Sequence, residues 1–301
     1  MMLTVGGDDE EGERLDMAML TLPDGGRLHI KDTGMGRHVV VMVHGWSSTQ
    51  RVYAKPVILM RGKLRCITYD QRGHGRSRGA SGEHVTTETL ASDLQELLVS
   101  LGLTDVILLG WSMGASVVMN YLMRYGTARL DHVVLCDMTP KLMSDKDWEL
   151  GIYQGQYTQS ERMVDETRPF FMQYREFAVR SVPRLRKLPA ALLSAGCKMR
   201  LSHCDVETLE SLADSMREQD LRGSLTGLDV PLTYFYADPG TLFSPELATW
   251  YAQNVPSPFR AVRFEHATHM LVEEQPVKFA KEVLSIALQV DERPSHRMPT
   301  A

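Results

Sequence analysis

The sequence of 301 residues lacks the features that mark several special classes of protein. No uncharged run of roughly 18 apolar residues occurs, so we expect no membrane-spanning helix. The first residues show no basic segment followed by an apolar one, and we therefore expect no signal peptide. The net charge of −5 offers no basic surface to nucleic acid or to an anionic membrane. These absences favour a cytoplasmic protein that does not bind nucleic acid.

Cysteine is scarce as well. The four cysteines are Cys66, Cys136, Cys197 and Cys204, and no two of them form a C-x-x-C pair, so neither a disulfide framework nor a metal site is predicted. The segment SHCD at 202–205 combines His, Cys and Asp, but no second cluster has metal-ligand spacing, and a helix cap is the simpler interpretation. We expect neither a metal nor a cofactor.

Apolar, β-branched runs alternate with segments of helical periodicity over much of the chain. Eight runs are typical of strands: 18–23, 27–32, 38–45, 64–70, 105–109, 131–136, 231–238 and 259–265. The segments typical of flanking helices are 50–61, 86–101, 114–125, 245–253 and 276–289. This alternation predicts the α/β class, with a mostly parallel, eight-stranded sheet that opens on an antiparallel hairpin and is flanked by helices.

The alternation is interrupted between residues 140 and 225, where helical stretches rich in Met, Tyr, Phe and Arg replace it. We interpret 140–225 as a helical cap, or lid, inserted over the strand ends of a core formed by 17–139 and 226–290. Residues 1–16, which include an acidic run, and residues 291–301 are predicted to be flexible tails.

The pentapeptide GWSMG at 110–114 places Ser112 between a strand-like run and a helical one. A serine hydroxyl is a poor nucleophile unless an adjacent base takes its proton. A tight strand-to-helix turn exposes the hydroxyl and requires small neighbours, which Gly110 and Gly114 provide. The start of the helix would also direct backbone N–H groups toward a developing oxyanion. Ser112 is therefore the predicted nucleophile.

The base is expected after the last strand, in the segment FEHATHMLVEEQP. Two histidines occur there, and we favour His269 over His266. A lone histidine is more often a satisfied core or surface side chain, but here both fall where a base is required.

An oxyanion hole needs a second backbone N–H besides the one at the start of the helix after Ser112. The segment VHGWSS at 43–48 is predicted to supply it. Gly45 would let the backbone approach the ligand, and the N–H of Trp46 would join that of Met113. The side chains of Trp46 and Trp111 are expected to line an acyl pocket, with the alternative that both only cap the sheet. Trp148 belongs to a set of aromatic and Met residues in the cap, some of which we expect to contact the substrate.

Four motifs together carry a family resemblance: HGW at 44–46, YDQRGHGRS at 69–77, GWSMG at 110–114 and HMLVEEQP at 269–276. Residues 17–289 resemble the α/β-hydrolase superfamily, and within it the esterase and cofactor-free haloperoxidase-like branch with a helical cap. The resemblance implies Ser112 as the nucleophile, His269 as the base, and the amides of Trp46 and Met113 as the oxyanion hole.

The acid of the triad departs from the pattern of the superfamily. Its usual place, after the strand expected at 231–238, falls on Gly240 in this chain. Asp238 lies two positions earlier, a difference that a rearranged loop could absorb. The other candidate is Asp137, at the end of the strand after the nucleophile helix, where some relatives in the superfamily carry their acid. We favour Asp137 and retain Asp238 as the alternative.

The expected function is that of a Ser-His-Asp hydrolase that cleaves a carboxylic ester, or a related acyl compound, through an acyl-enzyme. The expected partner is a small, apolar acyl substrate. The sequence leaves open whether the protein forms a homodimer. The same groups are compatible with perhydrolysis of the haloperoxidase type and with thioester or C–C bond hydrolysis. A second hypothesis, from another class, is a non-catalytic protein that keeps the pocket for ligand binding.

Overall fold

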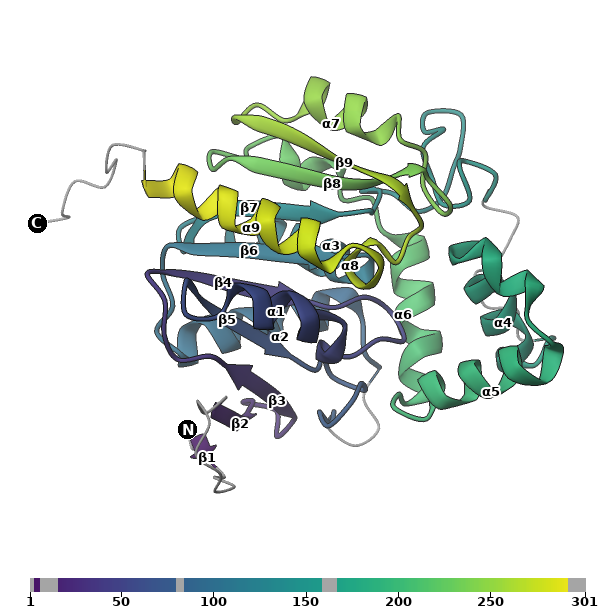
Figure 1. Cartoon of the computed structure of the whole chain (residues 1–301), viewed down its shortest axis with the longest axis horizontal. Coiled ribbons are helices and arrows are strands. Elements are labelled where there is room, and N and C mark those ends of the chain that lie inside the picture. The colour runs from purple at the N-terminus through teal and green to yellow at the C-terminus, as the bar shows by residue number, and fades with distance from the viewer. Residues whose placement is uncertain (1–2, 6–15, 80–83, 159–166, 292–301) are drawn as a thin grey trace, which may run out of the picture.

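One twisted sheet runs through the part of the chain that the computed structural model describes, which is residues 3–5, 16–79, 84–158 and 167–291 (Figure 1). Its strands are β1 (Leu3–Val5), β2 (Asp16–Thr21), β3 (Arg27–Asp32), β4 (His38–Val43), β5 (Leu64–Tyr69), β6 (Val106–Trp111), β7 (Leu130–Cys136), β8 (Leu232–Pro239) and β9 (Phe259–Ala267). The order is β1-β2-β3-β5-β4-β6-β7-β8-β9. The pairs from β5 to β9 are parallel, and the pairs that involve β1, β2 or β3 are antiparallel. The predicted mostly parallel sheet with an opening hairpin is confirmed.

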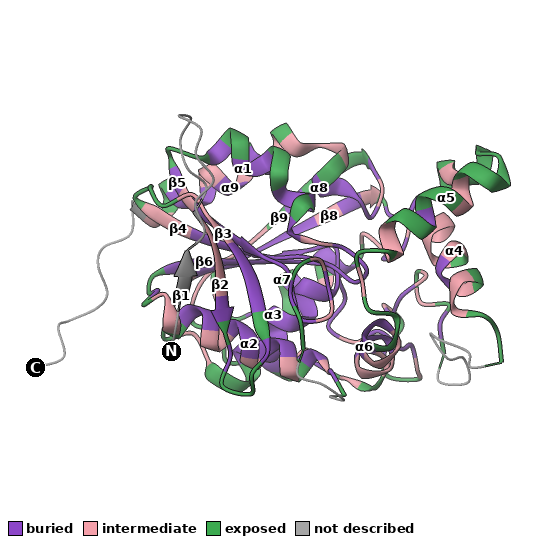
Figure 2. Cartoon of the chain, turned by 90° about the horizontal axis from the view of Figure 1, so that it is seen from below, coloured by how far each residue is buried: buried purple, intermediate pink, exposed green. Residues whose placement is uncertain are grey.

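Helices cover both faces of the sheet. In the core they are η1 (Gln50–Tyr53), α1 (Ala54–Met60), α2 (Thr87–Ser100), α3 (Met113–Tyr125), α7 (Leu247–Asn254), α8 (Leu271–Glu274) and α9 (Pro276–Asp291). Helices α1 and α9 lie on one face, and α2 and α3 lie on the other (Figures 1 and 2). The right-handed crossovers typical of parallel strands produce such a three-layered arrangement.

The alternation of side chains along β4 explains why the sheet is buried on both faces. Val41 and Val43 pack into the cluster that includes α2 and α3, whereas Val40 and Met42 pack into the cluster with α1 and α9. Successive side chains of a strand point to opposite faces, so a continuous apolar run suits a strand that is covered twice. Figure 2 shows this burial along the central strands, while the outer faces of the helices are exposed.

The N-terminal segment differs in part from the expectation of a flexible tail. Residues 3–5 form β1 and pair with β2, and β2 begins at Asp16. This pairing adds a ninth strand at the edge of the sheet, beside the hairpin of β2 and β3. The remainder of the expected tail at 1–16, and residues 292–301 of the other one, lie outside the described residues.

Between residues 140 and 225, the described part of the chain holds helices and no strand. They are α4 (Phe170–Ser181), η2 (Pro183–Lys187), α5 (Ala190–Leu201), α6 (Val206–Glu218) and η3 (Arg222–Leu225). Pro169 and Pro189 directly precede α4 and α5, and Pro183 begins η2, as expected of residues whose fixed φ suits a helix start. Helices α4 and α5 stand away from the sheet, while α6 lies beside the core (Figure 1).

The carboxyl ends of the parallel strands bring distant residues to one edge of the sheet. Gly45 follows β4, Ser112 follows β6, Asp137 follows β7 and Thr241 follows β8. Ligands of open α/β sheets bind at this edge, because the loops that leave the strands converge there. None of the helices in the described ranges is long and apolar enough to cross a membrane.

Candidate active site

Ser112 occupies a strained turn between β6 and α3. Its φ of 56° and ψ of −129° lie outside the regions that non-glycine residues usually adopt. A Cβ atom on Gly110 would lie 2.3 Å from the carbonyl oxygen of Gly114, and one on Gly114 would lie 2.1 Å from that of Val43. The turn therefore has no room for a side chain at either position. This steric requirement explains the two glycines around the serine.

His269 lies between Ser112 and Asp137. Its Nε2 atom is 2.8 Å from the Oγ atom of Ser112, and its Nδ1 atom is 2.7 Å from Oδ2 of Asp137. The other carboxylate oxygen of Asp137 accepts the backbone N–H of Ala237 at 3.1 Å. The imidazole and the carboxylate are both buried, with side-chain exposures of 3% and 2%. The structure thus brings the predicted nucleophile, base and favoured acid into one chain of hydrogen bonds.

The two alternative residues lie apart from this chain of hydrogen bonds. The carboxylate of Asp238 pairs with the guanidinium of Arg263, on the neighbouring strand β9. His266 is exposed and belongs to β9, where its φ of 59° accompanies an irregular register between β8 and β9. Neither side chain is placed to assist Ser112 in this geometry.

The backbone of His269 is held by a residue that the sequence analysis did not identify. The hydroxyl of Thr241 accepts the N–H of His269 at 3.0 Å and donates to the carbonyl oxygen of Ser181 at 2.8 Å. Ser181 is the last residue of α4, so Thr241 links the histidine to that helix. On the other side, the indole N–H of Trp111 donates to the carbonyl oxygen of His269 at 2.9 Å. The only signal for Thr241 is its place next to Gly240, in the loop where the superfamily usually carries its acid.

The loop after β4 lies against Ser112. A Cβ atom on Gly45 would be 2.9 Å from the Cβ atom of Ser112 and 3.1 Å from the ring of Trp111, so only glycine fits without displacement. Trp46 follows, and its indole N–H donates to the carbonyl oxygen of Leu209 in α6. Met113 is the first residue of α3, and its N–H therefore has no carbonyl partner within that helix.

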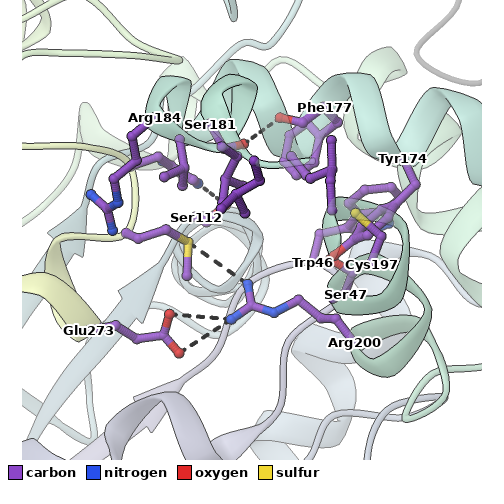
Figure 3. Close-up of a pocket in the computed structure, with 18 of the residues that line it drawn as sticks. Trp46, Ser47, Ser112, Tyr174, Phe177, Ser181, Arg184, Cys197, Arg200 and Glu273 are labelled. Atoms are coloured by element: carbon purple, nitrogen blue, oxygen red, sulfur yellow. Dashed lines mark hydrogen bonds and ion pairs between the residues drawn. The ribbon is translucent and has the colours of Figure 1, made fainter. Parts of the chain in front are cut away.

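A cavity of about 390 Å³ opens above Ser112 and His269, between the core and helices α4 and α5 (Figure 3). Trp46 and Trp111 line it, as expected from the sequence. Eight further residues of the wall are apolar: Phe177, Ala178, Val182, Leu185, Leu188, Leu192, Leu193 and Met270. Trp148 is not part of this wall. It packs edge-on against Trp250 and lies under Arg222, so the structure does not bring it to the cavity.

Charged side chains line one side of the cavity and pair with each other. Arg200 of α5 lies 3.3 Å from both carboxylate oxygens of Glu273 and 4.0 Å from the sulfur of Met270 (Figure 3). Arg184 of η2 pairs with Glu274, which also accepts hydrogen bonds from Thr268. Both ion pairs connect the α4–α5 region to α8, which begins directly after the loop of His269.

A cysteine is also present in the wall, but it is not a competing nucleophile. Burial raises the pKa of the Cys197 thiol, although Arg175 and Arg200 lower it in part, so the reactive thiolate is disfavoured. No group of three or more His, Cys, Asp or Glu side chains within the described ranges could hold a metal ion. In the SHCD segment, the Asp205 carboxylate accepts the N–H of Thr208 and caps α6, as interpreted from the sequence.

Comparison with known proteins places this geometry in a family. The model of the alpha/beta hydrolase family matches residues 40–282. The chain belongs to this family. The match includes the turn around Ser112 as well as His269 and Asp137, so the family expected from the motifs is confirmed.

Individual alpha/beta hydrolase relatives have several activities. A pimeloyl-[acyl-carrier protein] methyl ester esterase from Nitrosospira multiformis is 23% identical and matches 86% of this chain and 98% of its own. A non-heme chloroperoxidase from Kitasatospora aureofaciens is 36% identical over 132 residues, which are 44% of this chain and 47% of the relative. The solved structure of an esterase from Exiguobacterium antarcticum has a TM-score of 0.77 at 22% identity, covering 90% of this chain and 98% of that one. The two esterase names agree with the expected class, a hydrolase of the carboxylic-ester type.

Proposed function

We propose that the protein is a serine hydrolase that cleaves a carboxylic ester through an acyl-enzyme, with Ser112, His269 and Asp137 as its triad. The observation that carries this proposal is the continuous chain of hydrogen bonds from Asp137 through His269 to Ser112 at the floor of an apolar cavity. A hydroxyl, an imidazole and a carboxylate in this order are the arrangement that turns serine into a nucleophile.

The reaction proceeds in two stages. The Oγ atom of Ser112 attacks the ester carbonyl while Nε2 of His269 takes its proton, and the imidazolium then gives that proton to the leaving alcohol. Water attacks the acyl-enzyme in the second stage, with His269 again acting as base. Asp137 keeps Nδ1 of His269 protonated and stabilises the imidazolium that forms.

The amides of Trp46 and Met113 bind the oxyanion in this proposal. Trp46 follows Gly45, which closely approaches Ser112, and Met113 directly follows Ser112 at the start of α3. Stabilising the negative charge that develops on the carbonyl oxygen is commonly the largest single contribution to this kind of catalysis. Trp111 is buried and holds the loop of His269 through its indole N–H.

Perhydrolysis is the second candidate, because one relative is named a non-heme chloroperoxidase. Hydrogen peroxide would replace water in the second stage and release a peracid from the same acyl-enzyme. The two activities share every residue of the triad, and they differ only in which nucleophile reaches the acyl group. Adding peroxide to an ester assay and trapping the peracid separates them.

The test of the proposed function is the hydrolysis of p-nitrophenyl butyrate by the native chain, Ser112→Ala and His269→Gln. We expect measurable turnover by the native chain and a loss of roughly 10⁴-fold to 10⁶-fold in kcat for either variant, because members of a triad act as a unit. Turnover that is absent from the native chain, or unchanged in Ser112→Ala, would support the non-catalytic binding protein instead.

A further inference from the structure

A glycine lies in the middle of the helix that forms the outer wall of the cavity. Gly196 belongs to α5, and it lines the cavity together with Leu192, Leu193 and Arg200 of the same helix. Residues three and four positions apart share one helix face, so Gly196 sits at the centre of the face that α5 presents to the cavity. Its neighbours on this face have long side chains, and it has none.

The backbone does not explain this glycine. Glycine is unfavourable in a helix interior relative to alanine, so its presence needs a reason. Gly196 lacks the positive φ that favours glycine elsewhere, and a Cβ atom at this position would have no atom within 4 Å. This contrasts with Gly110 and Gly114, where backbone atoms leave no room. Gly196 is exposed and lines the cavity, so a side chain at 196 would extend into the open space at the rim of the cavity.

The chemistry of the surrounding wall defines what could occupy this space. Leu185 and Leu188 come from η2 and the residue after it, Leu192 and Leu193 come from α5, and all four line the same cavity as Gly196. The nearby charge of Arg200 is already balanced by Glu273. The wall therefore suits a neutral hydrocarbon chain better than a charged group.

We propose that Gly196 holds open a subsite for an extended apolar chain, and that the substrates are esters with such a chain rather than compact acetyl esters. This inference rests on the proposed ester hydrolysis at Ser112. The chain extends from the reacting carbonyl, past Phe177, to the gap that Gly196 leaves in the face of α5. Gly196 is thus a determinant of chain length, and a larger residue there would shorten the chain that the cavity accepts.

The experiment is a comparison of p-nitrophenyl esters from acetate to octanoate with the native chain, Gly196→Leu and the matched control Ala195→Leu. Ala195 is the neighbour on α5 and is exposed like Gly196, but it does not line the cavity. In the native chain, kcat/KM should rise by roughly fourfold for each added methylene that is buried. We expect Gly196→Leu to lower the ratio of octanoate to acetate kcat/KM at least tenfold, and Ala195→Leu to leave this ratio within twofold.

Octyl acetate and methyl octanoate show on which side of the ester the chain binds, and one of the two should lose activity in Gly196→Leu. A chain-length profile of Gly196→Leu that runs parallel to the native one, or an equal loss in Ala195→Leu, would overturn the proposal. Melting temperatures of both variants identify a general loss of folding.

A binding measurement keeps this inference separate from the proposed function. In the Ser112→Ala background, the fluorescence of Trp46 and Trp111, which line the cavity, reports the binding of methyl octanoate and methyl butyrate without turnover. Tighter binding of the octanoate, lost on adding Gly196→Leu, supports the subsite even if no ester is hydrolysed. Equal affinity for the two esters contradicts it. Failure of the proposed function would instead appear as an absence of Ser112-dependent hydrolysis at every chain length.

Discussion

The carboxylate of Asp137 lies 2.7 Å from the imidazole of His269, although 132 residues separate them in the sequence. Asp137 follows β7 and His269 follows β9, and β8 lies between these two parallel strands. The strand ends therefore bring the two side chains to the same edge of the sheet. Asp137 has a φ of 46°, a left-handed conformation that turns the chain sharply at the end of β7.

The identity of the acid gives the first prediction. Asp137→Asn should lower kcat by roughly 10⁴-fold, because an amide can hold the wrong tautomer of His269. Asp238→Asn is the matched control, since Asp238 pairs with Arg263 instead, and its kcat should change by less than threefold. The measurement is kcat for a p-nitrophenyl ester. Equal losses in the two variants would contradict the assignment of Asp137.

Thr241 gives the second prediction, as a residue that positions His269. Thr241→Val keeps the shape of the side chain and removes the hydroxyl that accepts the N–H of His269. A small displacement of the imidazole should lower kcat by roughly 10-fold to 100-fold with little change in KM. Thr241→Ser retains the hydroxyl and should recover most of the rate. A loss in both variants that follows their melting temperatures would indicate a structural role only.

Gly45 gives the third prediction. In Gly45→Ala the new methyl group would meet the Cβ atom of Ser112 at 2.9 Å, and neither is a flexible side-chain end. The displaced nucleophile should cost roughly 10-fold to 100-fold in kcat. Gly227→Ala is the control, because a Cβ atom there meets nothing within 4 Å and Gly227 does not line the cavity. Native rates in Gly45→Ala would show that the close approach is not required.

The fourth prediction concerns stability and pH. Burial lowers the pKa of His44, and burial together with the neighbouring His44 lowers the pKa of His74 from 6.5 to about 3. Both rings are neutral in the native state and take up protons on unfolding. The contribution of the two neutral rings to the free energy of unfolding is therefore fully present above the unfolded pKa of 6.5. It is lost as the pH drops toward 3.

The pH dependence can be measured by urea unfolding. The free energy of unfolding should fall between about pH 6 and pH 4, with His74 contributing up to about 1.4 kcal/mol per pH unit and His44 acting in the same direction. His74→Phe removes one of the two groups and should make this dependence shallower by that amount. The same pH dependence in His74→Phe and in the native chain would contradict the contribution of His74.

The features predicted from the sequence are those that local patterns determine. The strands of the parallel sheet follow from their apolar runs, and the turn at Ser112 follows from its two glycines. The choice between Asp137 and Asp238 depends instead on which carboxylate the ends of β7 and β8 direct toward His269, which no local pattern specifies. Trp148 was expected near the substrate because it is aromatic, but its packing against Trp250 is a tertiary contact. Thr241 and Gly196 matter through contacts with elements far away in the sequence.

The central claim is that Ser112 is an activated nucleophile, and covalent labelling tests it most directly. The native chain is incubated with an alkyl fluorophosphonate, and the adduct is located by intact mass and peptide mapping. Ser47→Ala is a matched control, since Ser47 lines the same cavity and bonds to Tyr174. We predict a single adduct on Ser112 that is absent from Ser112→Ala, forms at least 10³-fold more slowly in His269→Gln, and is unchanged in Ser47→Ala. A native chain that is not labelled at Ser112, or an adduct that persists in Ser112→Ala, would contradict the account.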